Sequence, residues 1–133
     1  MLPIYLVSLV DDSERRTLLK KRFSSYYTAF IHIEAVDGRI MPAKEYYQKT
    51  LPYFMKYKKT MSPAEWGCTS SHIKALETFL QTDEPYALIL EDDVIGNDQN
   101  LEEIAELATE LGADSLLLCG AQEGISQKYQ LGR

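Results

Sequence analysis

Residues 86–94 read Tyr86-Ala87-Leu88-Ile89-Leu90-Glu91-Asp92-Asp93-Val94, a short apolar run that ends on three consecutive carboxylates. A continuous apolar run of this length is typical of a strand buried on both faces in a parallel sheet. In open α/β sheets, ligands bind at the carboxyl ends of such strands. Adjacent carboxylates repel one another unless water or a cation screens them, and Mg²⁺, Mn²⁺ and Ca²⁺ prefer oxygen ligands. The stretch therefore predicts a sheet edge for a divalent cation and phosphate groups, with a solvated acidic turn as the alternative.

The first forty residues predict a strand, a helix and a second strand. Residues 3–9 form an apolar strand, and the polar residues 11–13 end it and cap a helix over residues 14–26. Residues 30–35 alternate between apolar and polar side chains, as strands with one buried face do, and residues 36–39 form the following turn. This order is that of a βαβ unit.

The middle of the chain predicts further helices. Residues 42–59 favour a helix, but Pro52 interrupts the pattern, so we expect two short helices or a helix and a loop. Ser62-Pro63-Ala64-Glu65 has the capping-box pattern with proline at the first helical position, which predicts a helix start. The expected inward stripe of this helix is apolar and consists of Trp66, Ile73, Leu76 and Leu80.

The last third of the chain continues the alternation. We expect Asn100 to cap a helix, and residues 115–119 to form a strand that ends at Gly120. The helix turns four apolar residues inward, Leu101, Ile104, Leu107 and Leu111. The whole pattern predicts an α/β fold with a mainly parallel sheet and helices on both faces, in one domain over residues 1–133.

Composition narrows the class of protein. The chain has 133 residues, 45% of them hydrophobic, and a net charge of −6, which fits a globular domain and argues against nucleic acid as a partner. Its two cysteines, Cys68 and Cys119, have neither metal-ligand nor redox spacing, so we expect both to be reduced core residues. No stretch approaches the roughly 20 apolar residues of a membrane span. Met1 leads directly into a strand pattern, so the expected location is the cytoplasm.

Four polar clusters follow predicted strands and are expected to meet at one sheet edge. They are residues 8–12, 37–39, 91–93 and 120–123. Such an edge suits a nucleoside diphosphate, which needs polar groups for base and ribose, a cation for the pyrophosphate and a basic group. Arg15 and Arg16 are candidates for the basic group, with a solvated helix face as the alternative. The sequence has no glycine-rich phosphate loop, so a metal has to hold the phosphates.

His72 is a further candidate site residue at this edge of the sheet. It shares one line of the predicted helix with Glu65 and Cys68, at three- and four-residue spacing. It is therefore a candidate to bind a metal or to orient a carboxylate, with a purely structural histidine as the alternative.

Two other patterns indicate alternatives. Residues 53–59 mix aromatic and cationic side chains, as membrane-surface segments do, although most such segments are simply amphipathic surface. Asp11 and Asp12 loosely resemble the acidic pocket of a receiver domain that accepts a phosphoryl group. Lys128 is poorly placed as the lysine of such a domain.

Five segments together resemble glycosyltransferase family 25, which contains bacterial lipooligosaccharide and lipopolysaccharide β-galactosyltransferases and relatives that modify collagen. The segments are residues 4–9, Arg15-Arg16, Val36-Asp37-Gly38, residues 61–72 and residues 86–94. The resemblance covers nearly the whole chain. It implies a GT-A, Rossmann-like fold, a UDP-sugar donor and a divalent metal, Mn²⁺ or Mg²⁺.

The resemblance also implies a role for each site residue. Asp93, the last carboxylate of the motif, contacts the metal, with Asp92 as a support and second candidate ligand. Glu91 lies near the donor ribose. The other donor-binding residues are Ser8, Arg15, Arg16, Asp37 and Gly38. By its chemistry, the metal neutralises negative charge that develops on the leaving UDP.

Members of this family are longer than this chain, so we expect a truncated fold that keeps the nucleotide-sugar half. The acceptor half and the catalytic base are then absent. The expected reaction transfers a hexose, galactose first, to a lipid-linked lipooligosaccharide or lipopolysaccharide glycan, with peripheral contact at the inner face of the cytoplasmic membrane. An inactive donor-binding fragment is the alternative. A cut sheet leaves an unpaired edge, which predicts a homo-oligomer.

Overall fold

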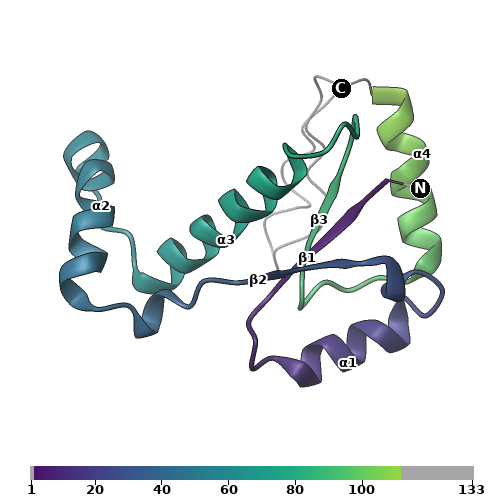
Figure 1. Cartoon of the computed structure of the whole chain (residues 1–133), viewed down its shortest axis with the longest axis horizontal. Coiled ribbons are helices and arrows are strands. Elements are labelled where there is room, and N and C mark those ends of the chain that lie inside the picture. The colour runs from purple at the N-terminus through teal and green to yellow at the C-terminus, as the bar shows by residue number, and fades with distance from the viewer. Residues whose placement is uncertain (1, 112–133) are drawn as a thin grey trace, which may run out of the picture.

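The structure, a computed structural model, describes residues 2–111 and shows a parallel sheet with helices on both faces (Figure 1). The elements in chain order are β1 (Ile4–Ser8), α1 (Ser13–Arg22), η1 (Tyr27–Ala29), β2 (Ile31–Glu34), η2 (Gly38–Ile40), α2 (Ala43–Tyr57), α3 (Pro63–Phe79), β3 (Leu88–Glu91) and α4 (Asp98–Leu111), where η marks a 3₁₀ turn. The strand order is β2-β1-β3, and both pairings are parallel. The predicted βαβ start and parallel α/β sheet are confirmed. The strand predicted over residues 115–119, with Cys119, lies outside the described residues.

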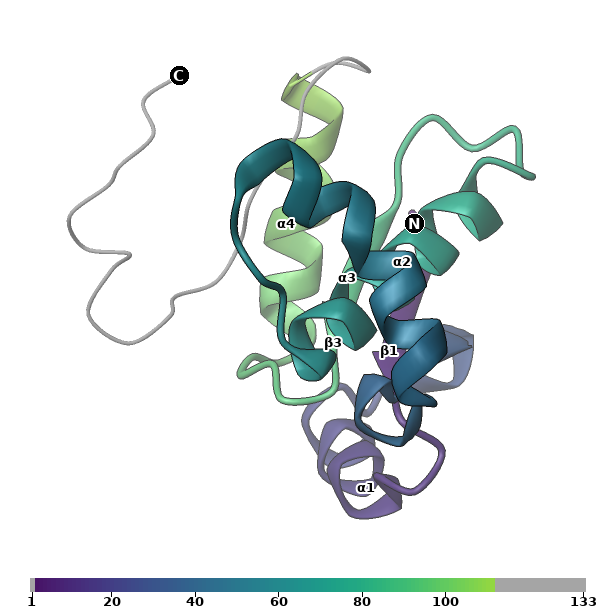
Figure 2. The same cartoon turned by 90° about the vertical axis from the view of Figure 1, so that its left-hand side faces the viewer.

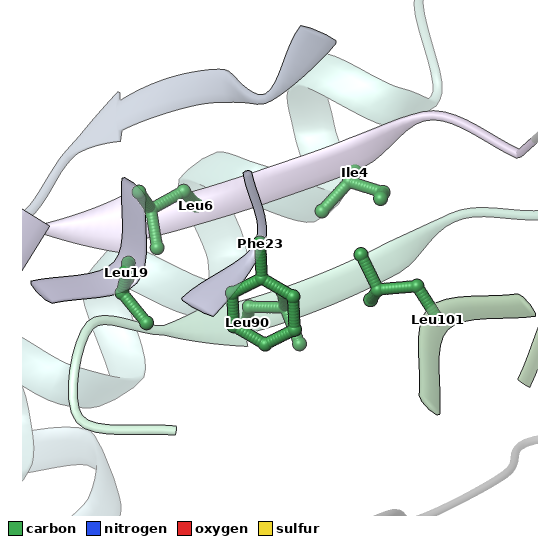
Figure 3. Close-up of a cluster of buried hydrophobic side chains, with 6 residues drawn as sticks. All are labelled: Ile4, Leu6, Leu19, Phe23, Leu90 and Leu101. Carbon is green, nitrogen blue, oxygen red and sulfur yellow. The ribbon is translucent and has the colours of Figure 1, made fainter. Parts of the chain in front are cut away.

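One face of the sheet packs against α1 and α4. The buried cluster on this face consists of Ile4, Leu6, Leu19, Phe23, Leu90 and Leu101 (Figure 3). In this cluster Phe23 stands between Leu19 of α1 and Leu101 of α4. Burial of one such side chain contributes about 1.5–3 kcal/mol, so the cluster is what holds the two helices on the sheet.

The opposite face of the sheet packs against α3. Its buried cluster consists of Tyr5, Val7, Ile33 and Ala75. The buried residues of α3 are all small, Gly67, Ser71 and Ala75, and they follow one another at four-residue spacing on one side of the helix. The helix backbone therefore lies close to the elements that it covers.

The closest approach joins α3 to the loop that follows β2. A Cβ atom on Gly67 would lie 2.5 Å from the carbonyl oxygen of Val36, and one on Gly38 would lie 1.9 Å from that of Pro63. Both distances are shorter than any normal contact, so only glycine fits at these two positions. The buried Ser71 hydroxyl accepts the Val36 N–H at 2.8 Å and donates to the Gly67 carbonyl at 2.6 Å.

The predicted inward stripe of α3 is wrong. Ile73, Leu76 and Leu80 are 46%, 48% and 73% exposed, and Trp66 is only half-buried. Large side chains on the inner side would hold the helix away from the backbone that it touches, so the small residues face inward instead. The predicted helix start is confirmed, because Ser62 and Glu65 form the complete capping box.

Helix α2 is continuous through Pro52, so the predicted interruption is wrong. Proline removes one hydrogen bond to the carbonyl four residues earlier, but Pro52 lies at an exposed position where water can satisfy that carbonyl. Figure 1 shows α2 at the opposite end of the molecule from α4, and Figure 2 shows it in front of the rest. No helix within residues 2–111 is both long enough and apolar enough to cross a bilayer.

Two helix boundaries differ from the prediction. Helix α1 ends at Arg22, because the chain turns at Phe23 so that its side chain enters the core. Helix α4 begins at Asp98, and its cap is Asn97 instead of Asn100. The two asparagines exchange hydrogen bonds, since each side-chain oxygen accepts the other's backbone N–H, at 3.1 and 3.2 Å.

We predict that Gly67→Ala destabilises the protein by about 1–3 kcal/mol, because the new methyl group overlaps the backbone of the loop after β2. In an uncrowded helix the same change stabilises by roughly 0.5–1 kcal/mol, so the sign of the effect is diagnostic. Urea unfolding measures the difference. Thr69→Ala, on the exposed side of α3, is the matched control and is expected within about 0.5 kcal/mol of the parent. Equal stability of the two variants would contradict the close approach.

Candidate functional site

The carboxyl ends of the three strands surround a pocket of about 330 Å³. Each strand contributes residues to its lining, namely Ser8 at the end of β1, Asp37 and Gly38 after β2, and Glu91 and Asp92 at the end of β3. The strands bring these residues together because Val7 of β1 is in register with both Ile33 of β2 and Glu91 of β3. Three of the four predicted polar clusters therefore meet at one edge. The fourth, residues 120–123, lies outside the described residues.

Ser8 and Arg16 hold the loop after β1. The buried Ser8 hydroxyl accepts a hydrogen bond from Nη1 of Arg16 at 2.8 Å and lies 3.3 Å from the Leu9 carbonyl, to which it donates. Arg16 also donates to the carbonyl of Leu9, and its Nη2 donates to that of Val10 at 2.6 Å. The Arg16 side chain therefore fixes the loop, and it is not part of the pocket lining.

Arg15 reaches the pocket and pairs with Asp92. Its Nη1 lies 2.9 Å from Oδ1 of Asp92, a carboxylate that is only 8% exposed. The hydrogen bond and the charge of Asp92 raise the pKa of Arg15 above its ordinary value. The other oxygen of Asp92, Oδ2, is buried and has no hydrogen-bond partner within the part of the chain that the structure describes. Such an orphaned oxygen is suited to receive a cation.

Asp37 is oriented by its neighbour Arg39. Nε and Nη2 of Arg39 each lie 2.8 Å from one oxygen of the Asp37 carboxylate, and the Arg39 backbone N–H donates to Oδ1 at 2.9 Å. These hydrogen bonds lower the pKa of Asp37 below its ordinary value. The carboxylate is therefore ionised and fixed at the pocket wall.

Helix α3 adds Cys68 and His72 to the pocket. Nε2 of His72 lies 3.0 Å from Oε1 of Glu91, and Sγ of Cys68 lies 4.0 Å from the same oxygen. Cys68 is exposed, so its predicted place in the core is wrong. Because the small residues of α3 face inward, the neighbouring side of the helix, with Cys68 and His72, faces the end of β3. Partial desolvation at the pocket wall raises the pKa of the Cys68 thiol, and the charges of Glu91 and Asp93 add to the effect.

Asp93 lies apart from the other predicted site residues. Its side chain is exposed, and it is not part of the pocket lining. Sequence reasoning missed Cys68 as a site residue. Its four-residue spacing from His72, on a helix just before the acidic strand, was the available signal.

Comparison with known proteins places the chain in a family. The model of glycosyltransferase family 25, described as a lipopolysaccharide biosynthesis protein family, matches residues 1–128. The chain belongs to glycosyltransferase family 25. This membership favours a glycosyltransferase over the receiver domain that Asp11 and Asp12 suggest, whereas a parallel sheet alone does not decide between them.

Two curated members of glycosyltransferase family 25 are similar to the chain. Both are described as glycosyltransferase 25 family members. The protein from Anopheles gambiae is 31% identical over 96 residues, which are 68% of this chain and 16% of that protein. The protein from Drosophila pseudoobscura pseudoobscura is 27% identical over 96 residues, which are 68% of this chain and 15% of that protein. The chain thus spans about a sixth of the length of these relatives, and no solved structure matches it.

We predict that Arg39→Gln raises the pKa of Asp37 toward the ordinary value of about 3.9, because it removes the two side-chain hydrogen bonds to the carboxylate. NMR titration of the Asp37 carboxyl carbon measures this shift. Because the pair lowers the pKa in the folded state, its stabilisation is present above the ordinary value and is lost as pH falls through the lowered one. Lys49→Gln, which removes a cation on α2, is the control and leaves the Asp37 titration unchanged. An unshifted Asp37 in Arg39→Gln would refute the assigned cause.

Proposed function

We propose that this chain is the donor-binding part of a metal-dependent GT-A glycosyltransferase that takes a UDP-sugar. The observation that supports the proposal is the pocket at the carboxyl edge of a parallel sheet in a chain of family 25. Nucleotides bind at this edge in open α/β sheets, because the loops there present backbone and side-chain polar groups. Carboxylates and Arg15 meet at the same place.

Each pocket residue then has a role in donor binding. Ser8, Asp37 and Gly38 line the nucleoside. Arg15 supplies positive charge for the pyrophosphate, to which its guanidinium can donate two hydrogen bonds. Within residues 2–111, the side-chain contacts of Glu91 with α3 both use Oε1, which leaves Oε2 to accept a ribose hydroxyl. Arg16 contributes indirectly by holding the loop that carries Ser8.

Asp92 and Asp93 fit a hard divalent cation, Mn²⁺ or Mg²⁺. Two adjacent carboxylates supply oxygen ligands, and Oδ2 of Asp92 is a buried acceptor that has no hydrogen-bond partner within residues 2–111. A bound cation would neutralise negative charge on the leaving UDP. The two carboxylates are the residues of this chain that would hold the cation. His72 would help to position it, because His72 orients Glu91, the carboxylate that precedes them in the sequence.

We extend the proposal to galactose as the sugar and to a lipid-linked lipopolysaccharide glycan as the acceptor. The acceptor follows the description of the family model, lipopolysaccharide biosynthesis, whereas galactose follows only the resemblance to the β-galactosyltransferases of the family. A second candidate is a donor-binding module without turnover. It is favoured by the pairing of three of the four acids that line the pocket, since Asp37, Glu91 and Asp92 each already contact an arginine or histidine. A general base needs a free carboxylate or imidazole near the acceptor hydroxyl. Self-association of the chain stays a prediction.

We predict that Asp93→Ala weakens Mn²⁺-dependent binding of UDP by about 100-fold or more, because a diphosphate approaches these carboxylates only with a cation between them. Calorimetry with UDP, UDP-galactose and UDP-glucose, with and without Mn²⁺, measures the effect. Asp83→Ala removes an exposed carboxylate from the loop after α3 and is the matched control. Unchanged UDP affinity in Asp93→Ala would contradict the assignment of Asp93 as a metal ligand. Binding of UDP by the parent without any sugar transfer would favour the donor-binding module without turnover.

Helix α2 suits peripheral contact with the inner face of the cytoplasmic membrane. Exposed apolar residues follow one side of it, Tyr47, Leu51, Phe54 and Met55. Residues 43–59 carry five lysines and one glutamate, in a chain whose net charge is −6. The positive charge of this segment complements the anionic lipid surface. An enzyme that acts on a lipid-linked glycan gains from such contact, because its acceptor lies at that surface.

We predict that changing Lys58 and Lys59 together to Gln weakens binding to anionic phospholipid vesicles roughly 30-fold, since each lysine near such a surface contributes about 1 kcal/mol. Cosedimentation with vesicles measures the binding. The matched control changes Lys20 and Lys21, an adjacent pair on α1, in the same way and leaves the binding nearly unchanged. Equal losses in both variants would indicate nonspecific attraction, and the assignment to α2 would fail.

A further inference from the structure

The pocket contains a second set of metal-type ligands in addition to Asp92. The ligand atoms of Cys68, His72 and Glu91 all lie within 4.8 Å of one another. A thiolate, an imidazole and a carboxylate are the three ligand types of zinc sites in proteins. We propose that Cys68, His72 and Glu91 bind Zn²⁺, with a fourth coordination position open to the pocket.

The distances are close to those that zinc needs. With Zn–S bonds of about 2.3 Å and Zn–N or Zn–O bonds of about 2.0–2.2 Å, neighbouring ligand atoms in a tetrahedral site lie roughly 3.3–3.6 Å apart. Nε2 of His72 is 3.0 Å and Sγ of Cys68 is 4.0 Å from Oε1 of Glu91. The observed separations lie on both sides of the tetrahedral value. All three side chains are exposed or half-exposed, so they can rotate toward the ligand spacing of a tetrahedral site.

The backbone fixes the three ligands before any metal binds. Cys68 and His72 are one turn apart on α3, so their side chains lie on the same side of the helix. The capping box at Ser62 and the close contact of Gly67 hold this end of α3 in place. Glu91 comes from a different element, the last residue of β3, which is paired with β1. Two separately anchored elements thus present the ligands, as preorganised metal sites require.

The ligand set selects zinc over the cation of the proposed function. Thiolate and imidazole are softer ligands than the carboxylates that Mg²⁺ and Mn²⁺ prefer, and they favour Zn²⁺. The positive ion would also offset the negative charge of Glu91, whose Oε1 lies beside the Cys68 sulfur. The zinc site uses the side of Glu91 that faces α3. It therefore stands on its own geometry and does not depend on binding of a UDP-sugar.

The test uses the full chain in reduced form, with Co²⁺ as a spectroscopic probe and Zn²⁺ in calorimetry. We expect one Co²⁺ per chain, a thiolate-to-cobalt charge-transfer band in the near ultraviolet, and displacement of Co²⁺ by Zn²⁺. Cys68→Ser removes the charge-transfer band, and it weakens Zn²⁺ binding by about 100-fold or more, since one of three ligands is lost. His72→Gln weakens Zn²⁺ binding to a similar extent.

The chain offers a matched control for each variant, because it has only two cysteines and two histidines. Cys119→Ser and His32→Gln remove the other member of each pair, and both are expected to keep the cobalt spectrum and the Zn²⁺ affinity. Urea unfolding without metal shows whether each variant is folded. A cobalt complex without the thiolate band, or equal Zn²⁺ affinity in the parent, Cys68→Ser and His72→Gln, would overturn the proposal. Because no nucleotide is present, either outcome leaves the donor site to be judged separately.

Discussion

The contact between Gly38 and Gly67 is the constraint on which the rest of the structure depends. At this point the backbone of α3 meets the backbone of the loop after β2, with no side chain between them. The contact sets the distance of α3 from the sheet and also its rotation about its own axis. Because the side with Gly67 must face inward, the neighbouring line with Cys68 and His72 must face the end of β3. The same contact holds Gly38 at the pocket wall. One steric requirement thus shapes both sides of the site.

Three of the four acids that line the pocket are paired with a basic side chain. Arg15 faces Asp92, Arg39 faces Asp37, and His72 faces Glu91. Within the described residues, Asp93 is the acid of the motif that has no such partner. In ion pairs that are partly exposed, the net stabilisation is small, so the more important effect is orientation: each carboxylate is held in one geometry. On the proposed function, such a pocket would give a diphosphate positive charge from arginine, and it would give a cation the carboxylate oxygens that do not contact the arginines.

The elements that the sequence predicts well are those in which one local rule decides the outcome. The apolar run before Glu91 becomes a strand, and the capping box at Ser62 starts a helix at the expected residue. The inner side of α3 was mispredicted, because periodicity assigns large apolar residues to the core, whereas the close approach at Gly67 demands small ones. Pro52 was read as a break, yet an exposed turn tolerates the missing hydrogen bond. The site edge follows from strand order, but the partners of each carboxylate depend on tertiary contacts that no spacing reveals.

Glu91 links the two proposals for the pocket. It is the last residue of β3, it contacts both Cys68 and His72 through one oxygen, and its other oxygen is available for a ribose hydroxyl. A zinc ion on the first oxygen draws electron density from the whole carboxylate and so weakens the second oxygen as an acceptor. Zinc and a UDP-sugar would then bind with negative coupling, and by linkage each would lower the affinity of the other by the same factor. On these two proposals, zinc bound at Cys68, His72 and Glu91 would alter the affinity for the donor through the shared carboxylate of Glu91.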